Sequence, residues 1–221
     1  MSQSLILITK APTAGDVKTR LCPPLSHEEA AALHHCFFLD TVEKIMRLGM
    51  TNPVISYTPD SEQAYFEALV PGALLLPQRG DELGARMADC FEQRFIRGDT
   101  GVILTGSDLP TLPQRVFWEA VKRLASPQID MVIGPSEDGG YYLVGLCSVQ
   151  RYLFEDMTWS TPQVFGETVQ RAKKLGLRLA YLPTWFDVDT PDDLDRLHAL
   201  WTRKPDAIPT HTRQFLSDFH R

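Results

Sequence analysis

The sequence predicts an α/β fold of three layers, in which helices cover both faces of a mostly parallel β-sheet. Short apolar segments of strand length alternate with helical segments through most of the chain. This alternation is typical of βαβ units joined by right-handed crossovers. The segments at residues 5–8, 74–76 and 102–104 are apolar throughout, as expected for strands that are buried on both faces.

Local signals place the individual elements. Ser26 and Glu29 form a capping box at the start of the first long helix, and Gly49 ends this helix. Further helices are expected at residues 61–70, 113–125 and 163–175, and another begins at residue 191. One more helix should run through residues 87–95 and end at Gly98. Strands are expected at residues 5–8, 54–57, 73–76, 102–104, 131–133, 141–146 and 177–182, and the sixth should form a hairpin with the fifth.

Length and composition limit the class of protein. The chain has 221 residues and a net charge of -6, which suits one domain at residues 1–202 and a tail or short helix at residues 203–221. The acidic balance argues against a nucleic-acid partner, and no apolar run reaches the length of a membrane span. The N-terminus lacks the pattern of a signal peptide, and four scattered cysteines suggest free thiols. We therefore expect a cytoplasmic protein.

Unusual polar residues follow the predicted strands. Ligands of open α/β sheets bind beyond the carboxyl ends of the strands, so these loops should converge on one edge. The loops lie at residues 10–20, 78–86, 106–110, 135–140 and 186–189.

The first of these loops is a candidate phosphate site. It has small residues, including Gly15, beside Lys10, Lys18 and Arg20, but it matches neither a Walker A loop nor a dinucleotide fingerprint. Such a loop suits phosphate oxygens, to which Arg can bind in a bidentate manner. Arg86, after the third strand, is a further candidate for phosphate binding. A solvated basic loop is the alternative interpretation.

Three aspartates are candidate ligands of Mg²⁺ or Mn²⁺. Asp108 follows the fourth strand, and Asp187 and Asp189 alternate around Val188, so both of their side chains can point the same way. Two close carboxylates repel each other unless a cation lies between them, and Mg²⁺ prefers carboxylates together with substrate phosphates. Asp108 could instead form an Asx-turn. Asp192 and Asp193 fit the first turn of a helix, where acidic side chains are favourable.

The segment Asp138, Gly139, Gly140 and Tyr141 has two interpretations. It can be a simple Gly-Gly hairpin turn, or its glycines can let the backbone approach a ligand closely. His34 and His35 lie within a helix without a carboxylate nearby in the sequence, so we expect them to pack or face solvent. The chain contains neither a G-x-S-x-G elbow nor an HExxH motif, and no nucleophile or general base is assigned.

Five motifs together resemble a bacterial GT-A-fold family described as glycosyltransferases or nucleotide-diphospho-sugar transferases. They are TKAPTAGDVKTRL at residues 9–21, QRGDELGARM at 78–87, GSDLP at 106–110, GPSEDGGYYLVGL at 134–146 and FDVDTPDDL at 186–194. The resemblance covers roughly residues 4–200. More distantly, the basic loop and the last motif resemble guanylyltransferases of deazaflavin-cofactor biosynthesis and cytidylyltransferases of molybdenum-cofactor maturation. The Asp-x-Asp of GT-A glycosyltransferases is reduced here to Ser107-Asp108.

The resemblance implies a Mg²⁺- or Mn²⁺-dependent glycosyltransferase that uses a nucleotide-diphosphate sugar and a small-molecule acceptor. Lys18 and Arg20 would contact phosphates, Asp108, Asp187 and Asp189 would hold the metal, and residues 138–142 would line the acceptor pocket. The alternative is a nucleotidyltransferase that joins an NTP to a phosphorylated small molecule and releases pyrophosphate. The basic loop alone slightly favours this alternative. A nucleotide-sensing module without catalysis is a third hypothesis.

Overall fold

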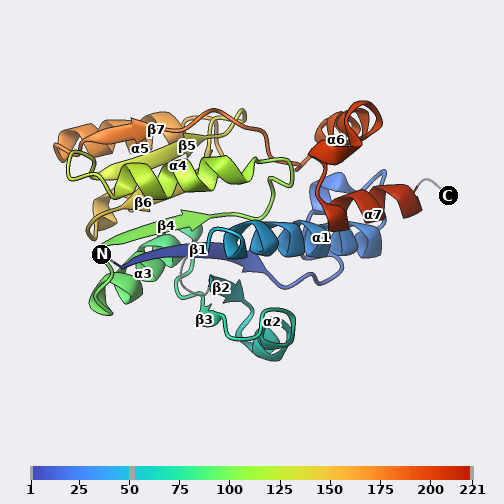
Figure 1. Ribbon diagram of the computed structural model, residues 1–221, viewed down its shortest axis with the longest axis horizontal. Coiled ribbons are helices and arrows are strands. Elements are labelled where there is room, and N and C mark those ends of the chain that lie inside the picture. The colour runs from blue at the N-terminus through green and yellow to red at the C-terminus, as the bar shows by residue number, and fades with distance from the viewer. Residues whose placement is uncertain (1, 50–52, 220–221) are drawn as a thin grey trace.

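A mixed β-sheet forms the middle layer of the protein in the computed structural model, which describes residues 2–49 and 53–219 (Figure 1). Its seven strands lie in the order β3-β2-β1-β4-β6-β5-β7. The strands are β1 (Gln3–Lys10), β2 (Val54–Thr58), β3 (Leu74–Pro77), β4 (Gly101–Thr105), β5 (Met131–Pro135), β6 (Tyr141–Leu146) and β7 (Leu179–Tyr181). The three-layer α/β/α fold predicted from the sequence is confirmed.

Strand β6 is the one strand of this sheet that runs antiparallel to its neighbours. It pairs with β4 on one side and with β5 on the other, whereas β1, β2, β3, β4, β5 and β7 form parallel pairs. The predicted hairpin between β5 and β6 is therefore present. As a result, its loop lies at the same edge as the carboxyl ends of the parallel strands.

Helices cover both faces of the sheet. They are α1 (His27–Met46), α2 (Gln63–Leu69), α3 (Leu83–Ile96), α4 (Gln114–Leu124), α5 (Val164–Lys174), α6 (Pro191–Arg203) and α7 (Thr210–Phe219). Leu7 of β1 packs in one core cluster with Phe38 of α1 and Phe117 of α4, and α2 also contributes to this cluster. Its neighbour Ile6 packs on the opposite face with residues of α3 and α5. Successive residues of β1 are thus apolar because both faces are covered.

The chain after the sheet folds back onto α1. A third core cluster joins α6 and α7 to the first turns of α1, and Figure 1 shows this group beyond one end of the sheet. The buried Asp40 of α1 accepts hydrogen bonds from the His211 amide at 3.0 Å, from the Thr212 amide at 2.8 Å and from the Thr212 hydroxyl at 2.6 Å. The start of α7 is therefore fixed on α1.

Most predicted boundaries lie within a few residues of those observed. The capping box of Ser26 and Glu29 is present, and Gly49 follows the end of α1 with a φ of 64°. Strand β1 is longer than predicted because it pairs on both sides, which extends it through polar residues at each end. Strand β7 is shorter than predicted because it lies at the edge and pairs only with β5. Within residues 2–49 and 53–219, no helix combines the length and hydropathy needed to cross a bilayer.

Candidate functional site

A cavity of about 630 Å³ opens at the edge where the parallel strands end. The loops after β1, β3, β4, β5 and β7 contribute to its wall, together with residues 159–164 before α5. Nine of the candidate site residues line it: Lys10, Lys18, Arg86, Asp108, Asp138, Gly140, Tyr141, Asp187 and Asp189. The topology therefore brings together side chains that are far apart in the sequence.

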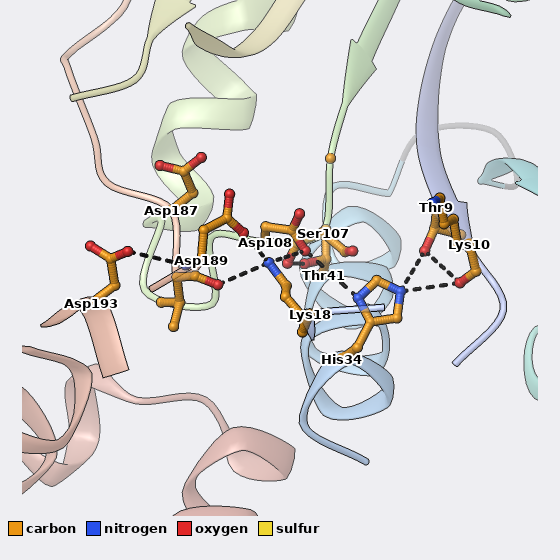
Figure 2. A network of polar contacts seen from close by, with 12 residues as sticks. Thr9, Lys10, Lys18, His34, Thr41, Ser107, Asp108, Asp187, Asp189 and Asp193 are labelled. Atoms are coloured by element: carbon orange, nitrogen blue, oxygen red, sulfur yellow. Dashed lines mark hydrogen bonds and ion pairs between the residues drawn. The ribbon is translucent and has the colours of Figure 1, made fainter. Parts of the chain in front are cut away.

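Lys18 lies at the centre of the acidic part of this cavity (Figure 2). Its ammonium is 2.6 Å from Asp189 Oδ1 and 2.9 Å from Asp108 Oδ1, and it donates to the Val188 carbonyl at 2.9 Å. Its side chain is only 5% exposed. Burial by itself lowers the pKa of Lys18, but the charges of Asp108 and Asp189 outweigh burial and raise it above its ordinary value. Lys18 is therefore a charged group that bridges two carboxylates.

His34 of α1 forms the wall behind Asp108. Its Nδ1 lies 3.7 Å from Asp108 Oδ1, and its Nε2 lies 3.1 Å from the Lys10 carbonyl and 3.3 Å from the Thr9 hydroxyl (Figure 2). Burial alone would raise the pKa of Asp108, but Lys18 and His34 hold it well below its usual range. Asp108 is consequently a carboxylate at neutral pH.

Asp187 lies beside Asp189 and has a different environment. It accepts a hydrogen bond from the Ser136 hydroxyl at 2.9 Å, while Asp189 contacts Lys18. Burial and the charges of Asp189 and Asp138 raise the pKa of Asp187 to about 6. The crowding of like charges around Asp187 is thus only partly relieved by the groups present.

The acidic group has the right donors for a hard divalent cation, but Lys18 shares two of its members. Carboxylate oxygens of Asp108, Asp187 and Asp189 are ligands that Mg²⁺ and Mn²⁺ accept, and burial and neighbouring carboxylates raise the pKa of Asp187. Among the described residues, no three His, Cys, Asp or Glu side chains are arranged as a preformed metal site. The position of Lys18 between Asp108 and Asp189 is consistent with this.

The candidate phosphate-binding residues separate into two groups. Lys10 and Arg86 line the cavity, and Arg86 donates through Nε to the Gly80 carbonyl at 3.0 Å. Gly15 and Arg20 are exposed and lie outside the cavity lining. Lys18 lines the cavity, but it contacts carboxylates, so the expectation that it binds phosphate does not follow from this arrangement alone.

The loop between β5 and β6 is a turn that also borders the cavity. Asp138 accepts a hydrogen bond from the Gly140 amide at 2.8 Å, which makes a local Asx-type turn. Gly139 has a φ of 90°, and a Cβ there would lie 2.3 Å from the Pro162 carbonyl, so this glycine serves close packing. Tyr141 lines the cavity, and burial raises its pKa. The turn predicted from the sequence is thus present, and the approach of this backbone to a ligand remains a prediction.

Sequence reasoning missed His34 and Ser136. His34 is buried, as expected for a packed residue, but α1 also places it 3.7 Å from Asp108, which is distant in the sequence. Ser136 lies directly before the acidic turn and donates a hydrogen bond to Asp187 across the sheet edge. Ser136 directly follows strand β5, which was the one available signal; the contact of His34 had no local signal. By contrast, Asp193 completes the capping box of α6 with Thr190, as predicted.

The fold is that of the GT-A glycosyltransferases and the related nucleotidyltransferases. A protein of Desulfovibrio desulfuricans G20, provisionally described as a nucleotide-diphospho-sugar transferase, is 31% identical, and the match covers 100% of this chain and 96% of that one with a TM-score of 0.90. The chain belongs to the family described as "Uncharacterized protein conserved in bacteria (DUF2064)", which matches residues 41–161. No curated protein matches the chain.

More distant solved structures share the fold alone. The inositol-1-phosphate CTP transferase of T. maritima is 13% identical, and the match covers 95% of this chain and 99% of that one with a TM-score of 0.53. The glucosyl-3-phosphoglycerate synthase of Mycobacterium tuberculosis, solved with Mn²⁺, UDP and phosphoglyceric acid, is 12% identical. Here the match covers 93% of this chain and 76% of that one with a TM-score of 0.50.

Proposed function

We propose that the protein is a divalent-metal-dependent glycosyltransferase, which transfers a sugar from a nucleotide-diphosphate sugar to a small acceptor. The observation that carries this proposal is the convergence of Asp108, Asp187 and Asp189 in one cavity on this fold. The relative at 31% identity, described as a nucleotide-diphospho-sugar transferase, supports the choice of donor.

Asp108, Asp187 and Asp189 would hold Mg²⁺ or Mn²⁺. When bound, such a cation supplies Lewis-acid stabilisation of the charge that develops on a leaving diphosphate. Ser136 would orient Asp187 through its hydrogen bond, and His34 lies against Asp108 on the side of α1.

The charge of the cavity also favours an added cation. Seven Asp and Glu side chains line it, against three Lys and Arg side chains. A diphosphate would be repelled from this surface unless positive charge entered with it. Lys10 and Arg86 are the cavity-lining cations available to orient phosphate oxygens, and Asp138 and Tyr141 would face the acceptor.

Product analysis tests the proposal. The protein is incubated with Mg²⁺ and a panel of nucleotide sugars or NTPs, and released nucleotides are separated by chromatography. We expect a nucleoside diphosphate from a nucleotide sugar, slowly even without acceptor, because water can enter an open cavity. Chelator should abolish this release. Asp189→Asn should reduce it by about 100-fold or more, the scale of losing charge stabilisation in the transition state.

The matched control is Asp206→Asn, since Asp206 is fully exposed and lies outside the cavity lining. This variant should keep wild-type release. Pyrophosphate from an NTP with a phosphorylated acid, and no nucleoside diphosphate from any sugar donor, would establish nucleotidyl transfer instead. Tight nucleotide binding without either product, across a broad acceptor panel, would indicate a sensing module.

A further inference from the structure

The Lys18 ammonium already has the surroundings of a bound cation. An ammonium carries three N–H groups, and here three protein oxygens lie around it. They are Asp189 Oδ1 at 2.6 Å, Asp108 Oδ1 at 2.9 Å and the Val188 carbonyl at 2.9 Å. These oxygens come from two loops that follow different strands. The Asp189 and Val188 oxygens accept hydrogen bonds from Lys18, and Asp108 forms an ion pair with it, so a phosphate oxygen would have to compete with these groups for the ammonium.

The same carboxylates would be needed by a divalent cation. An ammonium and a metal ion that share Asp108 and Asp189 would lie within a few ångströms, where two positive charges repel strongly. The Lys18 side chain is 5% exposed and the side chains of Asp108 and Asp189 are 38% and 33% exposed, so water screens this repulsion only in part. Lys18 and the metal would therefore compete for these oxygens.

We propose that Lys18 is an exchangeable counter-cation: it neutralises Asp108 and Asp189 in the metal-free protein, and a divalent cation displaces it into the cavity. This inference rests on the metal site of the proposed function. It adds that Lys18 is the group that controls access to this site.

The structure provides both a reason and a route for the displacement. Lys18 contacts Asp108 and Asp189, whereas Asp187 keeps its crowded carboxylate with only the Ser136 hydroxyl as its side-chain partner among the described residues. A divalent cation brings one more positive charge than Lys18 does, and it can serve all three carboxylates. Lys18 itself lines the cavity, next to residues 13–16, which are exposed, so its side chain has open space to enter.

The backbone of Lys18 also favours an exchangeable state. Its φ of 50° and ψ of 30° lie in the left-handed region, which costs a residue with a side chain roughly 1–2 kcal/mol. The contacts with Asp108 and Asp189 offset this cost in the metal-free form. A displaced Lys18 would expose free N–H groups where a diphosphate is expected to lie. Metal and nucleotide should therefore bind cooperatively, each favouring the same state of Lys18.

Binding of Mn²⁺ alone tests the inference without any reaction. Free Mn²⁺ is measured by electron paramagnetic resonance during titration of the wild type, Lys18→Met and Lys10→Met. Lys18→Met should bind Mn²⁺ at least about tenfold more tightly than the wild type, because its carboxylates have no competing cation. Lys10→Met removes the same charge from the same cavity but contacts neither carboxylate, so its affinity should change by less than about threefold.

Thermal melting supplies a second readout. Without metal, Lys18→Met should melt below the wild type because Asp108 and Asp189 lose their counter-charge, and Mn²⁺ should raise its melting temperature by more than that of the wild type. If Lys18→Met does not fold, Lys18→Arg serves instead. Because Lys18→Arg keeps a positive charge at this position, the variant should bind Mn²⁺ no more tightly than the wild type. Tighter binding by this variant would overturn the proposal.

The outcomes separate this inference from the proposed function. Equal Mn²⁺ affinity of the wild type and Lys18→Met would overturn the exchange and leave the metal site in place. Absence of Mn²⁺ binding in both proteins would overturn the exchange and the metal site together. Sugar transfer that persists in chelator would then show that the transferase activity survives without this metal.

Discussion

The backbone amide of Val188 donates a hydrogen bond to the carbonyl oxygen of Asp108 at 2.9 Å. This bond fastens the loop after β4 to the segment that leads into α6. Val188 itself is fully buried, while Asp187 and Asp189 on either side line the cavity. The alternation predicted from the sequence is therefore present, and a main-chain bond fixes the acidic pair beside Asp108.

The pKa of Asp187 predicts a pH-dependent cost to stability. Its pKa is about 6 in the folded protein against an ordinary value of 3.8, so between these values the folded state holds the proton more tightly than the unfolded state does. Stability contributed by this group therefore falls as pH rises from about 4 to about 6. In metal-free protein at pH 7–8, Asp187→Asn should raise the free energy of unfolding by roughly 1–3 kcal/mol.

Urea unfolding of the wild type and Asp187→Asn across this pH range measures the difference. The two curves should converge as the pH is lowered to about 3, below the ordinary pKa of 3.8, where Asp187 is protonated in both states. Asp206→Asn, at a fully exposed position, should follow the wild type throughout. A constant difference between wild type and Asp187→Asn at every pH would contradict the prediction.

Arg86 and Arg20 should differ in their effect on nucleotide binding. Arg86 lines the cavity, whereas Arg20 is exposed outside it. Arg86→Ala should weaken the binding of a nucleoside diphosphate by roughly 1.5–3 kcal/mol, the scale of a charge-assisted hydrogen bond. Arg20→Ala should change it by less than about 1 kcal/mol, as for an isolated surface charge. Calorimetric titration of both variants with a nucleoside diphosphate measures the two affinities. A larger loss of affinity in Arg20→Ala than in Arg86→Ala would place the phosphate site at the exposed part of the first loop.

Gly139 and Gly15 form a matched pair for the loop that borders the cavity. Both have a positive φ, of 90° and 87°, but an added Cβ meets the Pro162 carbonyl at 2.3 Å only at Gly139. At Gly15 nothing lies within 4 Å of the added atom. Gly15→Ala should therefore cost about 1–2 kcal/mol for backbone strain alone, and Gly139→Ala should cost clearly more. Equal melting temperatures for the two variants would show that the loop around Gly139 can shift to accommodate the added Cβ without loss of stability.

Asp40 should control the attachment of α7. Asp40→Ala leaves the His211 and Thr212 amides and the Thr212 hydroxyl without their acceptor, at a cost of about 2–4 kcal/mol. Residues 204–209 should then be cut faster in limited proteolysis, which would release α7. Asp218→Ala is the control, because Asp218 on α7 makes an exposed contact with Gln214. Unchanged cleavage of Asp40→Ala would show that apolar packing alone holds the helix.

The architecture was predictable because its signals are local. Strand-length apolar runs, the capping box of Ser26 and the Gly-containing turn before Tyr141 each act within a few residues, and each is observed. The grouping of the loops also followed, since parallel strands place their carboxyl ends at one edge. These features required no knowledge of contacts between distant side chains.

The partners of individual side chains were not predictable in this way. Lys18 was assigned to phosphate from its neighbours in the sequence, yet it reaches Asp189 across the sheet edge. His34 meets Asp108 only because α1 packs against β1 and the loop after β4, where Thr41 of α1 donates a hydrogen bond to the Ser107 carbonyl. Arg20 shares a motif with Lys18 but is exposed to solvent within the short turn at Thr19–Leu21. Residue type indicated the chemistry, and long-range packing selected the contacts.

Because strand β6 is antiparallel, the loop at residues 136–140 returns to the sheet and does not lead into a helix. Loops after β1, β3, β4 and β7 each lead into a helix, so a change in their length shifts a helix that packs elsewhere in the fold. The loop after β5 instead returns at once to the sheet, and Glu137 and Asp138 at its tip are exposed. The loop is nevertheless tied to α6 by the ion pair between Glu137 and Arg196, and to α5 by the Phe165 amide, which donates to the Gly139 carbonyl at 2.9 Å. A change in the length of this loop would therefore act on two helices that are distant from it in the sequence.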